Sequence, residues 1–152
     1  MATHWPKTNG PNFVPAYQVS GTPFVTSSTG IGTTPMKISF PQATRFFQVT
    51  NTGDTHLRVG FSENGVNANP AAQTNYFILS GGVSTERLEL RCKDLFIRLD
   101  AGSNGSFSLI AGLSGVARNQ FPVLTGTLIL SGADDEPLKP LGTGVPTFEG
   151  IG

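Results

Sequence analysis

The segment from Thr44 to Ser62 reads TRFFQVTNTGDTHLRVGFS and carries the clearest hairpin signal of the chain. Successive residues of a strand face opposite sides of a sheet, so apolar residues at every second position indicate a half-buried strand. Such residues occur on both sides of a central turn: Phe47 and Val49 with Arg45 before it, and Leu57, Val59 and Phe61 after it. The turn itself is expected at Asn51-Thr52-Gly53-Asp54, with a positive φ at Gly53.

The same alternation recurs outward from this hairpin in both directions, and helical periodicity is almost absent. The run Ser84–Cys92 alternates most regularly, with Leu88, Leu90 and Cys92 on one face. Short runs separated by turn residues are typical of β-sandwiches and barrels, so we expect an all-β domain of eight or nine strands. The expected strands are 22–26, 36–40, 44–50, 55–62, 75–80, 84–92, 95–99, 106–113 and 123–131, with loops over 27–34, 63–74 and 100–105.

Composition bounds the domain count and the class of partner. The chain has 152 residues, enough for one domain with one core. Charged residues make up only 13%, against roughly 25% in an average soluble domain. A surface so poor in charge suits contacts with neighbouring subunits. The formal net charge is zero, whereas proteins that grip nucleic-acid phosphates usually carry a basic surplus, so we expect no nucleic acid partner.

The single cysteine and the lack of long apolar runs indicate a reducing, non-membrane setting. Cys92 has no second cysteine with which to form an intramolecular disulfide. The start of the chain lacks the basic and apolar regions of a signal peptide. No apolar run reaches the ~20 residues that a membrane-spanning helix needs. We therefore expect no membrane span.

The two ends differ in composition from the middle and predict three segments. Residues 1–21 form an N-terminal arm that includes an extended stretch from Asn12 to Val19, residues 22–131 form the sandwich, and residues 132–152 form a Pro/Gly-rich C-terminal arm. Arms of this composition bury little apolar surface of their own. We expect neighbouring subunits to order them, with Trp5 as an anchor; the alternative is that they lie along their own domain.

No arrangement of residues predicts catalysis or metal binding. The candidate bases are His4 in the arm and His56 beside the hairpin turn, and Cys92 is expected to face the core. Two histidines and one cysteine far apart make a poor zinc site. The acidic run Asp134-Asp135-Glu136 lacks the alternating spacing of a calcium loop. We expect no enzyme activity, no cofactor and no metal.

Several of these segments together resemble a known family. The segments that carry the likeness are Arg45–Gly53, Leu57–Ser62, Asn75–Leu79, Leu88–Ile97 and Phe107–Leu113. They resemble the small single-jelly-roll capsid proteins of large double-stranded DNA viruses, in particular penton (vertex) and minor capsid proteins. The resemblance implies a jelly roll of about eight antiparallel strands, synthesis in the host cytoplasm and a place in the virion. It also implies self-association, with five copies closing a ring at an icosahedral vertex, and contacts with other capsid proteins.

The expected contact surface and the competing functions follow from this interpretation. We expect subunit contacts through the arms and a set of mostly outward-facing charged residues: Arg45, Arg58, Arg87, Glu89 and Arg91. The alternative is a ligand-binding sandwich, such as a carbohydrate-binding module or a receptor-binding fibre or decoration protein, which would display aromatic side chains in one groove. A hydrolase with two facing carboxylates is the third hypothesis.

Overall fold

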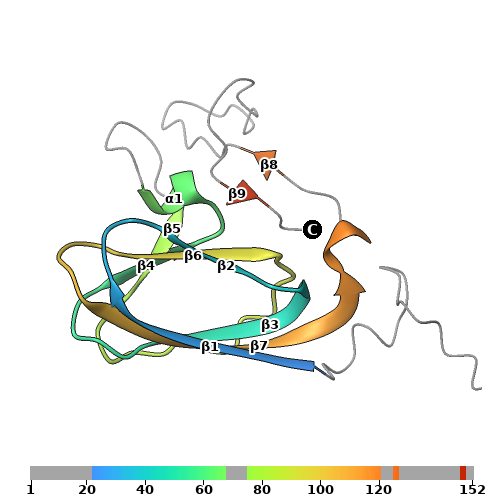
Figure 1. Cartoon of the computed structure of the whole chain (residues 1–152), viewed down its shortest axis with the longest axis horizontal. Coiled ribbons are helices and arrows are strands. Elements are labelled where there is room, and N and C mark those ends of the chain that lie inside the picture. Colours follow the sequence, from blue (N-terminus) through green and yellow to red (C-terminus); the bar gives the residue numbers. More distant parts are fainter. Residues whose placement is uncertain (1–21, 68–74, 121–124, 127–147, 150–152) are drawn as a thin grey trace, which may run out of the picture.

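The computed structural model describes residues 22–67, 75–120, 125–126 and 148–149. The predictions for residues 1–21 and for most of residues 132–152 lie outside this part of the chain. The all-β prediction is confirmed, because two antiparallel sheets pack face to face as the two layers seen in Figure 1.

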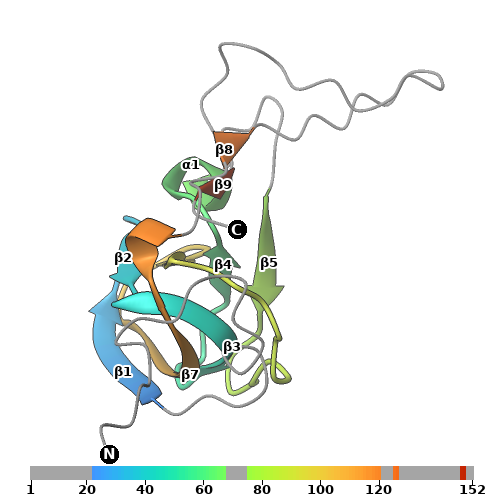
Figure 2. The same cartoon turned by 90° about the vertical axis from the view of Figure 1, so that its right-hand side faces the viewer.

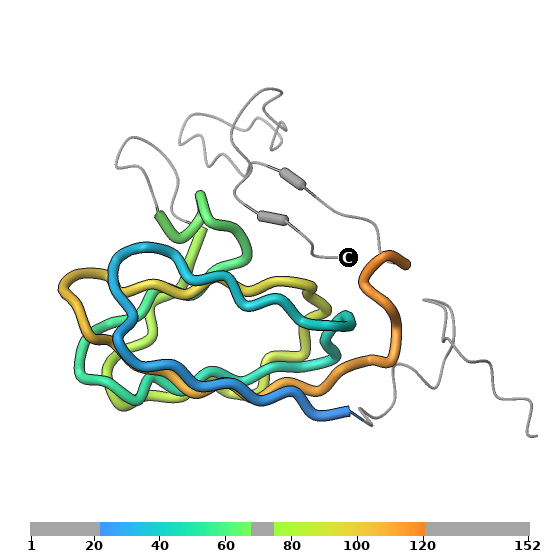
Figure 3. Tube along the Cα trace, in the orientation of Figure 1, coloured from blue at the N-terminus to red at the C-terminus, as the bar shows by residue number. Residues whose placement is uncertain are grey.

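The first sheet has three regular strands in the order β1-β7-β3: β1 (Thr22–Ile31), β7 (Gly105–Ala117) and β3 (Gln42–Asn51). The second has four in the order β2-β6-β4-β5: β2 (Met36–Ser39), β6 (Asp94–Leu99), β4 (Leu57–Gly60) and β5 (Tyr76–Leu79). The chain passes repeatedly from one layer to the other, as the tube in Figure 3 shows.

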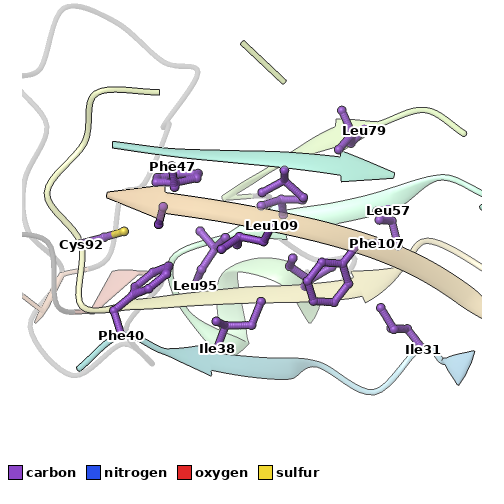
Figure 4. Close-up of a cluster of buried hydrophobic side chains, with 14 of the residues drawn as sticks. Ile31, Ile38, Phe40, Phe47, Leu57, Leu79, Cys92, Leu95, Phe107 and Leu109 are labelled. Carbon is purple, nitrogen blue, oxygen red and sulfur yellow. The ribbon is translucent and has the colours of Figure 1, made fainter. Parts of the chain in front are cut away.

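The core lies between the sheets and contains the residues that the alternation predicts (Figure 4). Phe47, Val49, Leu57 and Val59 of the predicted hairpin have no exposed surface. Phe24 and Phe40 meet edge to face with ring centroids 5.1 Å apart, in the geometry that aromatic quadrupoles favour. Further predicted core residues are also buried: Ile38, Cys92, Leu95, Ile97, Leu99, Phe107, Leu109 and Ala111.

The segment 83–92 lies along β3 but is not the regular strand that the sequence predicts. It forms isolated β-bridges to β3 rather than a continuous ladder, among them Ser84 to Thr50 and Leu88 to Phe47. Between them the Val49 amide bonds to the Thr85 hydroxyl rather than to a carbonyl. The Leu90 amide turns back to the Leu88 carbonyl, at 3.0 Å. Leu90 is consequently 42% exposed, so its predicted inward position is wrong.

Strand β1 continues to Ile31, where the sequence predicts a loop from Ser27 to Thr34. The Ser/Thr/Gly composition of this stretch is typical of loops. Pairing with β7 provides partners for its backbone as far as Thr29, and the register then shifts before Ile31. Gly30 has a positive φ of 73° at this irregularity, a conformation that glycine adopts without steric cost.

A short helix, α1 (Glu63–Asn67), occupies part of the predicted loop 63–74. Ser62 caps it, because the Ser62 hydroxyl accepts a hydrogen bond from the Gly65 amide at 3.0 Å. The helix packs closely on β4: a Cβ added at Gly60 would lie 2.7 Å from Val66 Cγ1. The prediction missed α1 because one helical turn leaves no periodic pattern.

The hairpin turn after β3 is present, but Gly53 has no positive φ, so that detail of the prediction is wrong. A Cβ at Gly53 would lie 3.2 Å from Ser106 Oγ, a tight contact that would require Ser106 to move slightly. The buried Asn51 side chain holds the turn by accepting the Gly53 amide and donating to the Thr55 and Leu79 carbonyls.

After β7 the chain forms a 3₁₀ turn, η2 (Arg118–Gln120). The short strands β8 (Thr125–Gly126) and β9 (Phe148–Glu149) pair antiparallel and lie beside α1 (Figure 2). The rest of the predicted strand 123–131 falls outside the described residues. In the part of the chain that the structure describes, no helix is long and apolar enough to cross a membrane.

Candidate interaction surface

The outer face of sheet β1-β7-β3 carries side chains without charge. Period-two alternation turns Val25, Ser27 and Thr29 of β1 outward, and the register with β7 and β3 sets their neighbours. One row across the sheet is Val25, Ile110, Gln48, and the next is Ser27, Ser108, Thr50. We call this surface the uncharged face and define it by nine residues: Val25, Ser27, Thr29, Phe46, Gln48, Thr50, Ser106, Ser108 and Ile110.

The sequence explains why this face lacks charge. There is no Asp, Glu, Lys or Arg between Lys7 and Lys37, nor between Asp100 and Arg118. Strands β1 and β7 lie entirely within these two gaps. Burial of the β1 and β7 part of this face would therefore remove no charged side chain from water, which is the most costly form of desolvation.

Hydroxyl groups at one end of the uncharged face bond to one another. Ser27 Oγ donates to Ser108 Oγ at 3.3 Å, and Thr52 Oγ1 donates to Ser106 Oγ at 2.9 Å. Thr50 Oγ1 and Ser84 Oγ lie 2.7 Å apart. Because these polar groups already have partners within the chain, covering them with another protein leaves fewer unsatisfied groups.

The other end of the uncharged face is apolar. Val25 is 70% exposed and Ile110 is 44% exposed, and the two are paired across β1 and β7. Phe46 lies beyond, half-buried, with the Arg87 guanidinium carbon 4.1 Å from its ring centroid. Adjacent exposed aliphatic side chains of this kind mark candidate contact sites.

A charged rim borders the uncharged face along the segment 86–91, and it holds three of the residues predicted from sequence. Arg87 and Glu89 pair at 3.2 Å, but both side chains are more than half exposed. Exposed pairs contribute about 0–1 kcal/mol, so the rim is available for other contacts at small cost. Arg91 is exposed on the same segment.

Arg45 lies on β3 beside this rim, at the irregularity between Thr44 and Phe46. Its Nη1 atom is buried and has no hydrogen-bond partner among the described residues, and the same holds for Gln42 Oε1. A buried polar group without a partner costs about 1–3 kcal/mol. Within the part of the chain that the structure describes, this end of β3 therefore holds a donor and an acceptor without a partner.

Arg58, the remaining predicted residue within the described chain, belongs to the other sheet and is engaged there. Its Nε donates to Asp100 Oδ1 at 2.6 Å, and its guanidinium lies 4.6 Å from the Tyr76 ring centroid. Neighbouring Arg98 donates to Asn67 Oδ1 of α1. Burial, and then the charge of Arg58, lower the pKa of Arg98. The structure thus separates Arg58 from the rim, and Trp5 lies outside the described residues.

An ion pair within the chain, between Arg118 and Asp94, occupies the corner between the two sheets. Arg118 binds both carboxylate oxygens of Asp94 at 3.0 Å and donates to the Phe40 and Lys93 carbonyls. Nearby, Thr44 Oγ1 lies 3.3 Å from Cys92 Sγ. Burial raises the pKa of Cys92 to about 11, so the thiol is unreactive at neutral pH.

Sequence reasoning missed the residues that define the open surface, above all Val25, Ser27, Ser108 and Ile110. The signal in the sequence that points to them is the absence of charged residues over the two long stretches that contain β1 and β7. Among the described residues, no group of three or more His, Cys, Asp or Glu side chains lies close enough to hold a metal ion. The sequence matches no protein-family model and no curated protein.

Proposed function

We propose that this protein is a structural component of a virus particle. In this role it is a building block of an icosahedral capsid, as a penton (vertex) or minor capsid protein, and it acts through contacts between subunits. We further propose that its sandwich is a single jelly roll.

The observation that carries the proposal is the nested order in which the strands pair. In a jelly roll of eight strands the first pairs with the last, the second with the seventh, the third with the sixth and the fourth with the fifth. With the segment 83–92 counted as the sixth strand, this chain pairs β1 with β7, β2 with β6, β3 with 83–92 and β4 with β5. Each of the four pairings agrees with the jelly-roll scheme.

The surface supports a role in assembly. The uncharged face and the charged rim are two different surfaces on one molecule. A closed ring needs such a pair of patches, because each copy meets the next through a heterologous contact.

The aromatic side chains favour assembly over sugar binding. Carbohydrate-binding sandwiches need exposed aromatic rings on which sugars stack. In residues 22–67 and 75–120, every Phe and Tyr is buried or half-buried. Tyr76 is already stacked against Arg58. Within these two ranges, the large exposed apolar residues are all aliphatic: Val25, Ile78, Val83, Leu90 and Ile110.

The mass of the full chain in solution, measured by light scattering over a range of concentrations, tests the proposal. We expect a discrete oligomer, and a mass five times the 16.0 kDa of one chain would identify the vertex protein. Variants lacking residues 1–12 or 132–152, checked for folding by circular dichroism, should form smaller species. A monomer at all concentrations that binds a sugar in a glycan screen would contradict the proposal and favour the ligand-binding alternative.

A further inference from the structure

Each of the two sheets has two edge strands, and the four edges differ in how they are protected against pairing with another chain. An exposed strand edge is a template for a further strand, and proteins usually block it with charge, short length or irregular backbone. Strand β2 has four residues and carries exposed Lys37, and β5 also has only four residues. The segment 83–92 is irregular and charged. Strand β1 has ten residues and no charge.

Among the described residues, no strand pairs with the outer edge of β1 over its central residues. In the order of the described strands, β1 is the terminal strand of its sheet, next to β7. Within the described part of the chain, the backbone of Phe24–Thr29 is hydrogen-bonded only in the ladder with β7. Pro23 limits this window at one end and the Gly30 irregularity limits it at the other. The window is long enough for a further strand of about six residues.

Pro23 indicates which residues face the open edge. Proline has no amide hydrogen, and in sheets its nitrogen faces away from the neighbouring strand. The backbone groups of alternate residues point the same way, so Val25, Ser27 and Thr29 direct their N–H and C=O groups to the open edge. Because Val25 and Thr29 lie at equal distances on either side of Ser27, the outward-facing backbone groups of two such strands can pair with each other when the strands run antiparallel.

We propose that the open edge of β1 binds β1 of a second copy of this chain, antiparallel and about a two-fold axis at Ser27. Ser27 then lies opposite Ser27 of the second copy, and Val25 lies opposite Thr29 of the second copy. Two sheets join into one of six regular strands, β3-β7-β1 continued by β1-β7-β3. A second β1 is the partner favoured by charge, because both strands are uncharged and no like charges meet.

This two-fold contact goes beyond the proposed ring contact, because it is isologous and uses a strand edge rather than two different patches. It brings two uncharged faces into one continuous surface. A ring of subunits with free β1 edges would thereby have a means of joining a neighbouring ring or subunit.

Cysteine cross-linking in the full-length protein tests the register. Residues directly opposite in a hydrogen-bonded pair have Cα atoms about 5.5 Å apart, within reach of a disulfide. Ser27→Cys should therefore form covalent dimers under mild oxidation. A mixture of Val25→Cys and Thr29→Cys copies should cross-link about tenfold faster than either alone, since each residue faces the other across the axis. Ile78→Cys, which is exposed on the other sheet, is the matched control.

Two substitutions at Val25 test the energetics. Val25→Pro removes an amide from the open edge, and Val25→Lys places a charge there, while both leave the ladder partner Ile110 unchanged. Each should raise the dimer dissociation constant at least about tenfold in analytical ultracentrifugation, with the β-sheet circular dichroism signal retained. Ile78→Lys should leave it unchanged.

The contact is overturned if Ser27→Cys cross-links no faster than Ile78→Cys, or if a folded Val25→Lys protein dimerises like the unchanged chain. These outcomes are separable from the capsid proposal. A ring that survives Val25→Lys and gives no Ser27→Cys cross-link retains the capsid role and excludes this contact. A protein that stops at the β1-linked dimer retains this contact and excludes the ring.

Discussion

The outer faces of the two sheets differ in their charge and in how much of each face the chain itself covers. On β2-β6-β4-β5, α1 packs against β4 and β6, and arginine side chains bind Asp100 and Asn67 of the same chain. On β1-β7-β3, uncharged side chains are exposed, and the outer edge of β1 has no neighbouring strand among the described residues. Some of the charged residues predicted to bind a partner thus form bonds within the chain, while the Ser, Thr and aliphatic residues of the uncharged face are exposed to solvent. Charge alone is a poor guide to the contact surface of this protein.

The largest expected effect concerns Cys92, which anchors the edge of the open sheet. Its pKa rises from 9.0 to about 11 through burial, so the folded state disfavours the thiolate. A raised folded pKa gives stability that is complete below the unfolded pKa and is lost as pH rises through the folded one. From about pH 8, below both pKa values, to pH 12, above both, the protein should lose about 3 kcal/mol in total relative to Cys92→Ala, measured by urea unfolding. Parallel pH profiles for the two proteins would contradict this.

A second experiment disrupts the packing of α1 against β4 on the sheet β2-β6-β4-β5. Gly60→Ala places a Cβ 2.7 Å from Val66 Cγ1 and 2.8 Å from the Asn75 carbonyl oxygen. Overpacking of this kind should cost about 2 kcal/mol of unfolding free energy. Gly32→Ala is the matched control, because nothing lies within 4 Å of the added carbon. Equal stability of the two variants in denaturant titration would show that α1 is not held against β4.

A third experiment compares arginines on the two sheets. Arg58→Met retains most of the apolar stem but removes the Asp100 pair and the contact with Tyr76. We expect a loss of about 1 kcal/mol, since the pair is partly exposed and screened. Arg87→Met at the rim should change thermal stability by less than about 0.5 kcal/mol. The comparison fails if the Arg87 variant is the less stable one.

The smallest expected change in stability is on the uncharged face itself. Ile110→Ser removes an apolar side chain that is 44% exposed and should alter the unfolding free energy by no more than about 0.5 kcal/mol. Its effect should appear instead in the concentration dependence of the mass in solution, where self-association weakens. An unfolding loss above ~2 kcal/mol would mean that this face supports the fold and is not a free surface.

The strands that alternate strictly were predictable, and the irregular ones were not. Phe47, Val49, Leu57 and Val59 follow the period of two and are all buried. Segment 84–92 follows it equally well, yet Leu90 is exposed because the Thr44 hydroxyl binds the Leu90 carbonyl and diverts the backbone. That bond joins residues far apart in the chain, so no local pattern could indicate it.

The predicted contact residues show the same division. Outward positions for Arg58, Arg87 and Glu89 followed from alternation, but their partners did not. Arg58 and Asp100 are brought together only when β4 pairs with β6, with Leu57 opposite Leu99. The importance of Val25 and Ile110 also depends on register, since neither is notable until the two lie side by side.

The sequence by itself determined the class of fold, the core positions and the low charge of the surface, because these depend on composition and on the short period of a strand. Only the tertiary structure decided which layer each strand joins, that Ser27–Ile31 is strand rather than loop, and which edge stays open. Backbone hydrogen bonds between strands distant in the chain decide these matters, and a strand's own residues do not specify its partner.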